Sequence, residues 1–264
     1  MASVFQGVNN FSKATDSRHV IHIGVFIPND CQLLDAAGVD IFGSMSYEYL
    51  SGLSNIFPQA MIDSAPSVVI HYIGSVSRGE HIPMTSNQTV MATDRFSDPE
   101  VAPGKLNIVY IPGPDPNCNF DPAALEWLRE QDAAEGVDIL SVCSGIFICG
   151  KAGLLKGRDI CGPRGGAQEM IKALGYEPRS MRGDELRWIQ DGNFWSSGGV
   201  TNGNDLVAAY CRANPKYFPR PLVEMTCEVL EVGDRPQHYT NEIKMGKYLE
   251  ELVQSQKVVS LGVE

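Results

Sequence analysis

One cysteine, Cys143, stands where the chain changes from one kind of structure to another. The residues before it, VDILSV (137–142), are apolar and mostly β-branched, and the residues after it are apolar at helical spacing. A side chain at a sharp strand-to-helix turn is pushed out of the sheet, and Gly145 is expected to keep the helix from crowding it. Backbone N–H groups at the start of that helix favour a thiolate and can hold developing negative charge. The pattern predicts a cysteine nucleophile, with a buried packing cysteine as the alternative.

The cysteines show no pairing pattern. Their number, seven, is odd and no two form a CxxC pair, so the spacing argues against a disulfide framework and against a metal site of the zinc type. Most are expected to be buried thiols, because free cysteine behaves as a small hydrophobe. Cys143 is predicted to be the most reactive, with a pKa lowered by helix-terminal amides and a strained corner. The set comprises Cys31, Cys118, Cys143, Cys149, Cys161, Cys211 and Cys227.

Strands and helices alternate along the chain. LNIVYIPG (106–113) is a nearly continuous apolar run, typical of a strand buried on both faces. The alternation predicts βαβ units, and therefore an α/β fold with a central, mostly parallel sheet and helices on both faces. Further strands are expected at 19–27, 67–74 and 137–143, a hairpin at 187–199, and helices at 31–45, 122–136, 144–155, 165–174, 203–213 and 241–256.

The chain of 264 residues is expected to form one large domain with two extensions. Residues 1–18 are interpreted as a flexible lead, residues 19–213 as the α/β domain, and residues 214–264 as a C-terminal extension. In that extension NPKYFPRPL (214–222) is expected to be loop. The extension is predicted to pack on the domain or on a dimer partner.

Charge and hydropathy exclude several classes of protein. The net charge of −11 argues against nucleic-acid binding and against docking on anionic membranes. No apolar run approaches the length of a membrane span, and the N-terminus lacks the pattern of a signal peptide. We therefore expect a cytoplasmic protein that acts on a small molecule.

Several separate motifs, in their order along the chain, resemble the ThiJ/PfpI superfamily. Within it they are most similar to the isocyanide hydratase branch and its fungal relatives. The resemblance covers about residues 20–212, which is most of the chain. The motifs are QLLDAAGVDIFG (32–43), IVYIPGP (108–114), SVCSG (141–145), AGLLKGR (152–158) and SSGGVTNGNDLV (196–207).

The resemblance implies a flavodoxin-like three-layer sandwich, usually dimeric, with the elbow cysteine at Cys143. It implies that an acidic residue of the first helix hydrogen-bonds the sulfur, and Asp35 matches the aspartate of the hydratase branch. Asp40, on the same predicted helix, is the competing carboxylate. Ser144 stands where that branch has a threonine and keeps the hydroxyl, so it is included among the predicted catalytic residues.

Two departures from the family pattern affect the predicted site. Many relatives carry a histidine where ICGPRGG (160–166) stands here, and Pro163 takes its place. The turn that is often Gly-Gly is Gly113-Pro114, and proline has no N–H to offer an oxyanion. Either the amides of Ser144 and Gly145 rebuild the oxyanion hole, or the chemistry needs less of it. Arg164 is expected to line the pocket, with an ordinary surface arginine as the alternative.

The predicted function is a cysteine-dependent hydration of a small electrophile, with an isocyanide converted to an N-substituted formamide. Cys143 would add to the electrophilic carbon, Asp35 would move protons, and no metal or organic cofactor would be needed. The alternatives are a cofactor-independent glyoxalase, a specialised lyase or cyclase step in secondary metabolism, and a redox or stress sensor without enzymatic activity. The glycine-rich GGVTNGND (198–205) follows the wrong element for a dinucleotide site.

Overall fold

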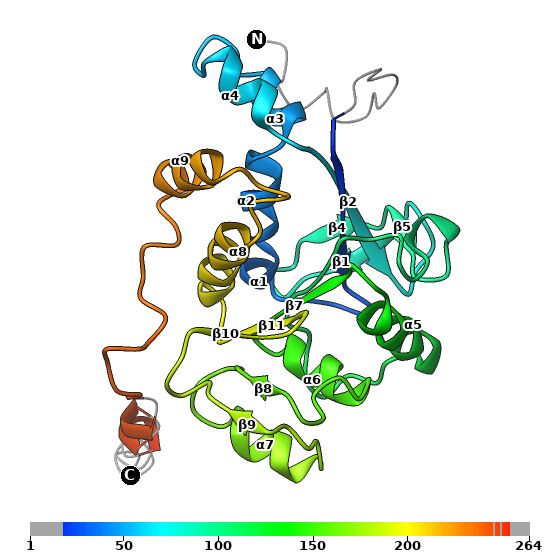
Figure 1. Ribbon diagram of the computed structural model, residues 1–264. Coiled ribbons are helices and arrows are strands. Elements are labelled where there is room, and N and C mark those ends of the chain that lie inside the picture. Colours follow the sequence, from blue (N-terminus) through cyan, green and yellow to red (C-terminus); the bar gives the residue numbers. More distant parts are fainter. Residues whose placement is uncertain (1–17, 245, 249, 254–264) are drawn as a thin grey trace, which may run out of the picture.

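A seven-stranded sheet forms the centre of the molecule (Figure 1). The computed structural model describes residues 18–244, 246–248 and 250–253. All neighbouring strands pair in parallel except β10 with β11, which form the predicted antiparallel hairpin. In spatial order the strands are β10 (Trp188–Asp191), β11 (Phe194–Ser197), β7 (Asp138–Val142), β6 (Ile108–Ile111), β1 (Val20–Phe26), β2 (Ser67–Gly74) and β5 (Asp94–Arg95).

Helices cover both faces of this sheet (Figure 1). One face carries α1 (Leu33–Ala36), α2 (Val39–Ser44), α8 (Asn202–Ala213) and α9 (Arg220–Leu230), and the other carries α5 (Pro122–Ala133) and α6 (Gly145–Lys151). The remaining elements are α3 (Tyr47–Ser51), α4 (Gln59–Ser64), α7 (Ala167–Ala173), a 3₁₀ turn (Pro99–Val101), β3 (His81–Pro83), β4 (Thr89–Met91), β8 (Asp159–Ile160) and β9 (Ser180–Met181).

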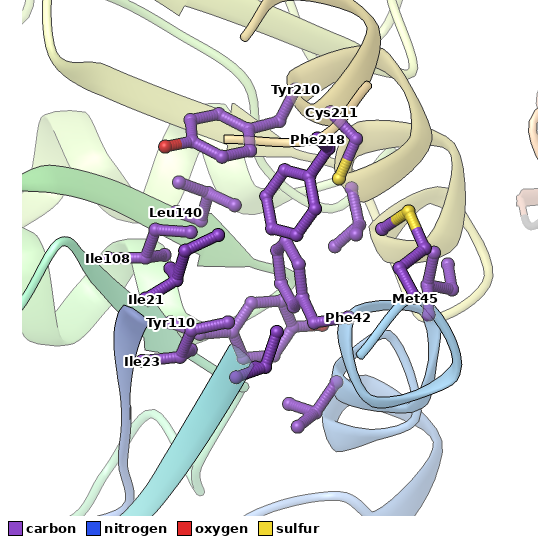
Figure 2. Close-up of a cluster of buried hydrophobic side chains, with 14 of the residues drawn as sticks. Ile21, Ile23, Phe42, Met45, Ile108, Tyr110, Leu140, Tyr210, Cys211 and Phe218 are labelled. Carbon is purple, nitrogen blue, oxygen red and sulfur yellow. The ribbon is translucent and has the colours of Figure 1, made fainter. Parts of the chain in front are cut away.

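Side chains of β6 alternate between two hydrophobic clusters, as a strand buried on both faces requires. Ile108 and Tyr110 point into the cluster under α2, α8 and α9, which also holds Phe42 (Figure 2). Val109 and Ile111 point into the cluster under α5 and α6. The predicted three-layer α/β sandwich with a mostly parallel sheet is therefore confirmed.

The helix predicted over 31–45 is two short helices, α1 and α2. At the junction, a Cβ on Gly38 would lie only 2.6 Å from the Tyr110 hydroxyl, so this close approach requires glycine. That hydroxyl donates to the main-chain carbonyl of Asp35 at 2.6 Å. The break lets a core tyrosine support the backbone that carries Asp35.

The loop predicted over 214–222 is wrong in its last residues, because α9 begins at Arg220. Its prolines caused the error: Pro219 is the N-cap and Pro221 lies in the first turn, where a missing N–H removes no helical bond. Leu222, with Val223 and Cys227, packs α9 into the core.

Of the helix predicted over 241–256, the structure describes a helical stretch at 246–248 and 250–253. Residues 245, 249 and 254–256 of that prediction lie outside the described residues, as do residues 1–17 of the predicted lead. Within the described ranges, no helix has both the length and the apolar character of a membrane span.

Candidate active site

Cys143 occupies a strained corner directly after β7, and α6 starts two residues later. Its φ is +57°, in the left-handed region that non-glycine residues seldom adopt. Such strain persists only where the surroundings impose it, and it is common at functional sites. The half-buried side chain therefore has the geometry of the predicted elbow.

Gly113 and Gly145, which lie near Cys143, are each packed so closely against neighbouring atoms that a side chain would not fit. A Cβ on Gly145 would collide with the carbonyl oxygen of Ile111, so the glycine lets α6 start against the end of β6. This differs from the sequence expectation, in which Gly145 made room for Cys143. A Cβ on Gly113 would lie 2.5 Å from Oδ2 of Asp35. Glycine here lets the turn after β6 reach the carboxyl group.

Asp35 is fully buried at the start of the first helix. Its Oδ2 accepts a hydrogen bond from the Gly113 amide at 3.2 Å, while Oδ1 has no partner of normal geometry among the described residues. Burial raises the pKa of Asp35 to about 6, against the lowering effect of hydrogen bonds from Cys143, Gly113 and Val200. An acid of this strength, with one open oxygen, can accept and return a proton near neutral pH.

The thiol of Cys143 differs from the sequence expectation. Burial raises its pKa to about 11, with the charge of Asp35 as the second cause, against the lowering effect of the amides of Val200 and Ser144. The predicted lowering of this pKa is therefore wrong, because desolvation and a neighbouring carboxylate outweigh the helix-terminal amides. Near neutral pH the proton rests on sulfur, beside an ionised carboxylate that can take it.

Asp40, the competing carboxylate, is exposed on α2. It is absent from the groups that shift the pKa of Cys143, whereas Asp35 is among the strongest of them. No histidine is among the described groups that affect either member of the Cys143–Asp35 pair. The structure thus brings Asp35 to the sulfur from a helix 108 positions earlier in the chain.

Ser144 holds the neighbouring turn. Its Oγ donates to the carbonyl of Pro114 at 2.7 Å. In that turn, the Gly113 amide is engaged by Asp35 and Pro114 has no N–H, so neither residue offers a donor to an oxyanion. The donors that act on the sulfur are the backbone amides of Ser144 and Val200.

Val200 is a residue of the site that sequence reasoning missed. It lies in the loop between β11 and α8 with a φ of +47°, a real outlier for a β-branched side chain. A Cβ on the preceding Gly199 would lie 4.0 Å from Cys143 Sγ. The segment 196–207 was noticed as a motif, but glycine and valine carry no sequence signal for an amide donor.

Arg164 lies against the C-terminal segment. Its guanidinium stacks on the ring of Tyr239, 3.9 Å from the centroid, and donates to the carbonyl of Asn241 at 2.8 Å. A role in lining the pocket stays a prediction. In the described part of the chain no three histidine, cysteine or acidic side chains are grouped as metal ligands.

Comparisons with known proteins give one sequence relative and several structural neighbours. No protein-family model matches the chain. The chain is 27% identical over 191 residues to an isonitrile hydratase of Pseudomonas putida, covering 70% of this chain and 77% of that protein.

Two solved structures share the fold. A ThiJ/PfpI family protein from Pseudomonas syringae has a TM-score of 0.57 at 19% identity, over 83% of this chain and 77% of that one. Drosophila melanogaster DJ-1beta has a TM-score of 0.59 at 14% identity, over 81% and 98%.

The sheet order and the covering helices define a flavodoxin-like α/β fold, which these neighbours share. The sequence match to an isonitrile hydratase supports the resemblance to the isocyanide hydratase branch of the ThiJ/PfpI superfamily that the motifs indicate.

Proposed function

We propose that this protein is a cysteine-dependent enzyme that hydrates an isocyanide to an N-substituted formamide. The observation that supports it most is the buried Asp35 carboxyl group, with one open oxygen, beside the thiol at the strained elbow. The pair supplies a nucleophile and a proton carrier without a metal or an organic cofactor. The similarity to an isonitrile hydratase supports the choice of substrate.

In the first step, Asp35 removes the proton from Cys143 as sulfur bonds to the terminal carbon of the isocyanide. The same proton is delivered to that carbon, so R–N≡C and the thiol give the thioimidate R–N=CH–S. In the second step, the oxygen of water bonds to the thioimidate carbon and one proton of water goes to nitrogen; the C–S bond then breaks, and the other proton of water goes to sulfur. The sum is R–N≡C plus water giving R–NH–CHO, with no oxidant or reductant.

Negative charge on sulfur develops while the proton is on Asp35. The backbone amides of Val200 and Ser144 lower the pKa of Cys143, so they stabilise that charge, and as parts of the backbone they need little reorganisation during the reaction.

The direct test is turnover of a simple isocyanide, followed by formamide production, in parallel with methylglyoxal, followed by lactate. Faster formamide production supports the hydratase. Lactate as the faster product would favour the glyoxalase alternative. Turnover of neither compound, with Cys143 still alkylated, would favour the specialised lyase or cyclase, or a redox sensor.

We also propose a homodimer, since closed twofold pairing is the commonest oligomer and superfamily members usually pair. Light scattering at micromolar concentration is expected to give twice the chain mass of 28.8 kDa. A single-chain mass under those conditions would rule the dimer out.

A cytoplasmic location is part of the proposal. All seven cysteines are free thiols in the structure, which suits a reducing compartment. Fractionation of cells that express the tagged protein would test it, with recovery outside the cytosolic fraction as the contrary result.

A further inference from the structure

Residues 232–241 link α9 to the C-terminal helical stretch (Figure 1). Leu186 and His238 form an antiparallel bridge, and the Arg187 amide donates to the Gln237 carbonyl at 2.8 Å. These contacts fix the register of the segment against the two residues that precede the edge strand β10.

Tyr239 of this segment is held between two arginines. Its ring centroid lies 3.9 Å from the guanidinium carbon of Arg164 and 4.5 Å from that of Arg187. Its hydroxyl packs against Gly198, where a Cβ would lie only 2.8 Å from the oxygen. The same hydroxyl accepts a hydrogen bond from Asn202 Nδ2 at 2.8 Å.

Asn202 connects this tyrosine to the loop at the site. It is 8% exposed, and its Nδ2 carries two hydrogens. One goes to Tyr239 and the other to the carbonyl of Gly199, at 3.1 Å, while its Oδ1 accepts from Arg187 at 3.3 Å. Both N–H donors of this amide are thus engaged, and the tyrosine hydroxyl sets which way it faces.

The carbonyl of Gly199 and the N–H of Val200 belong to the same peptide group. That group is trans, so its N–H points away from its C=O. Two donors of Asn202, its side-chain Nδ2 and its main-chain N–H, each hold the carbonyl at 3.1 Å. The N–H at the other side of the peptide lowers the pKa of both Cys143 and Asp35. The φ of +47° at Val200 is unfavourable and needs such an outside hold.

We propose that Tyr239 is a positioning residue for the reaction: through Asn202 it fixes the Gly199–Val200 peptide so that the Val200 amide serves the Cys143 sulfur. The inference rests on the proposed function for its role in turnover. Its geometric part concerns the thiol alone, and can be tested without any substrate.

The test uses the full chain with Tyr239→Phe, which removes only the hydroxyl oxygen. Iodoacetamide labelling of Cys143 near pH 8 is expected to slow about three- to tenfold, since a misplaced amide stabilises the thiolate less. The half-buried Cys118 should be labelled at an unchanged rate in the same sample. For an isocyanide, kcat is expected to fall about 10- to 100-fold with little change in KM.

Tyr248→Phe is the matched control, because it removes a tyrosine hydroxyl from the C-terminal helical stretch that follows this segment, at a 54% exposed position. Asn202→Ala removes the side-chain amide that joins Tyr239 to the Gly199 carbonyl. It serves as the test variant if Tyr239→Phe does not fold. The double variant Tyr239→Phe/Asn202→Ala should label no more slowly than Asn202→Ala, since the two residues act in series.

Unchanged labelling of Cys143 in both single variants would overturn the inference, and so would effects that multiply in the double variant. Slower labelling in a protein whose wild type turns over no isocyanide would support the positioning role while the proposed function fails. If the wild type is active and kcat is unchanged in Tyr239→Phe, the tyrosine hydroxyl has no role in turnover.

Discussion

Cys143→Ala is expected to abolish isocyanide turnover, with a loss on the order of 10⁵-fold or more, because removing a covalent nucleophile removes both steps of the reaction. The alanine keeps the Cβ and so keeps the same backbone strain at φ +57°. Stability should therefore change by less than about 1 kcal/mol, the usual range for a partly exposed position. Steady-state formamide production and thermal unfolding check the two expectations.

Cys118→Ala is the matched control, since it removes another half-buried thiol. Its turnover should equal that of the wild type. Residual activity in Cys143→Ala above a few per cent would show that sulfur is not the nucleophile. In the wild type, labelling of Cys143 is expected to depend on Asp35, because the pKa of the thiol is raised to about 11 and ordinary thiolate is scarce at neutral pH.

The sheet and the elbow could be predicted because their signals are local. The apolar run of β6 and the change of periodicity at Cys143 each depend on a few consecutive residues. Errors arose where a residue distant in sequence determines the local structure. The helix predicted over 31–45 breaks at Gly38, where the chain packs against Tyr110.

The electrostatics of the site could not be predicted from the sequence for the same reason. The backbone amide of Ser144 favours a low thiol pKa, but burial of the thiol, with the charge of Asp35 as the second cause, reverses the result. The amide of Val200 has no side-chain signature at all. Its part in the site depends on a peptide orientation that Asn202 fixes.

Asp35→Asn is expected to lower turnover about 10²- to 10⁴-fold, the usual contribution of a positioned acid or base. The amide keeps the size of the side chain and can still accept from the Gly113 N–H, so KM should change much less. Asp40→Asn is the control from the neighbouring helix and should retain full activity. Loss of turnover in Asp40→Asn instead would show that the carboxylate was wrongly assigned.

The pH dependence gives this prediction a second readout. In the wild type kcat should rise with pH through about 6, because Asp35 must be ionised to take the thiol proton. That limb should disappear in Asp35→Asn. If kcat of the variant still rises with pH through about 6, the titrating group is not Asp35.

As pH rises, the stability of the wild-type protein should fall while its kcat rises. A folded-state pKa of about 6 against 3.8 means that the native protein binds this proton more tightly than the unfolded chain does. Stability is therefore lost as pH rises from about 4 to about 6, by on the order of 2–3 kcal/mol for this one group. Asparagine does not titrate, so the stability of Asp35→Asn relative to the wild type should increase as pH rises from about 4 to about 6. The variant should be the more stable protein at about pH 7. Urea unfolding at both ends of the window measures the difference. If the difference in unfolding free energy between the two proteins is the same at both pH values, the pKa of the buried carboxyl group is not raised. Its role as proton carrier depends on that raised pKa.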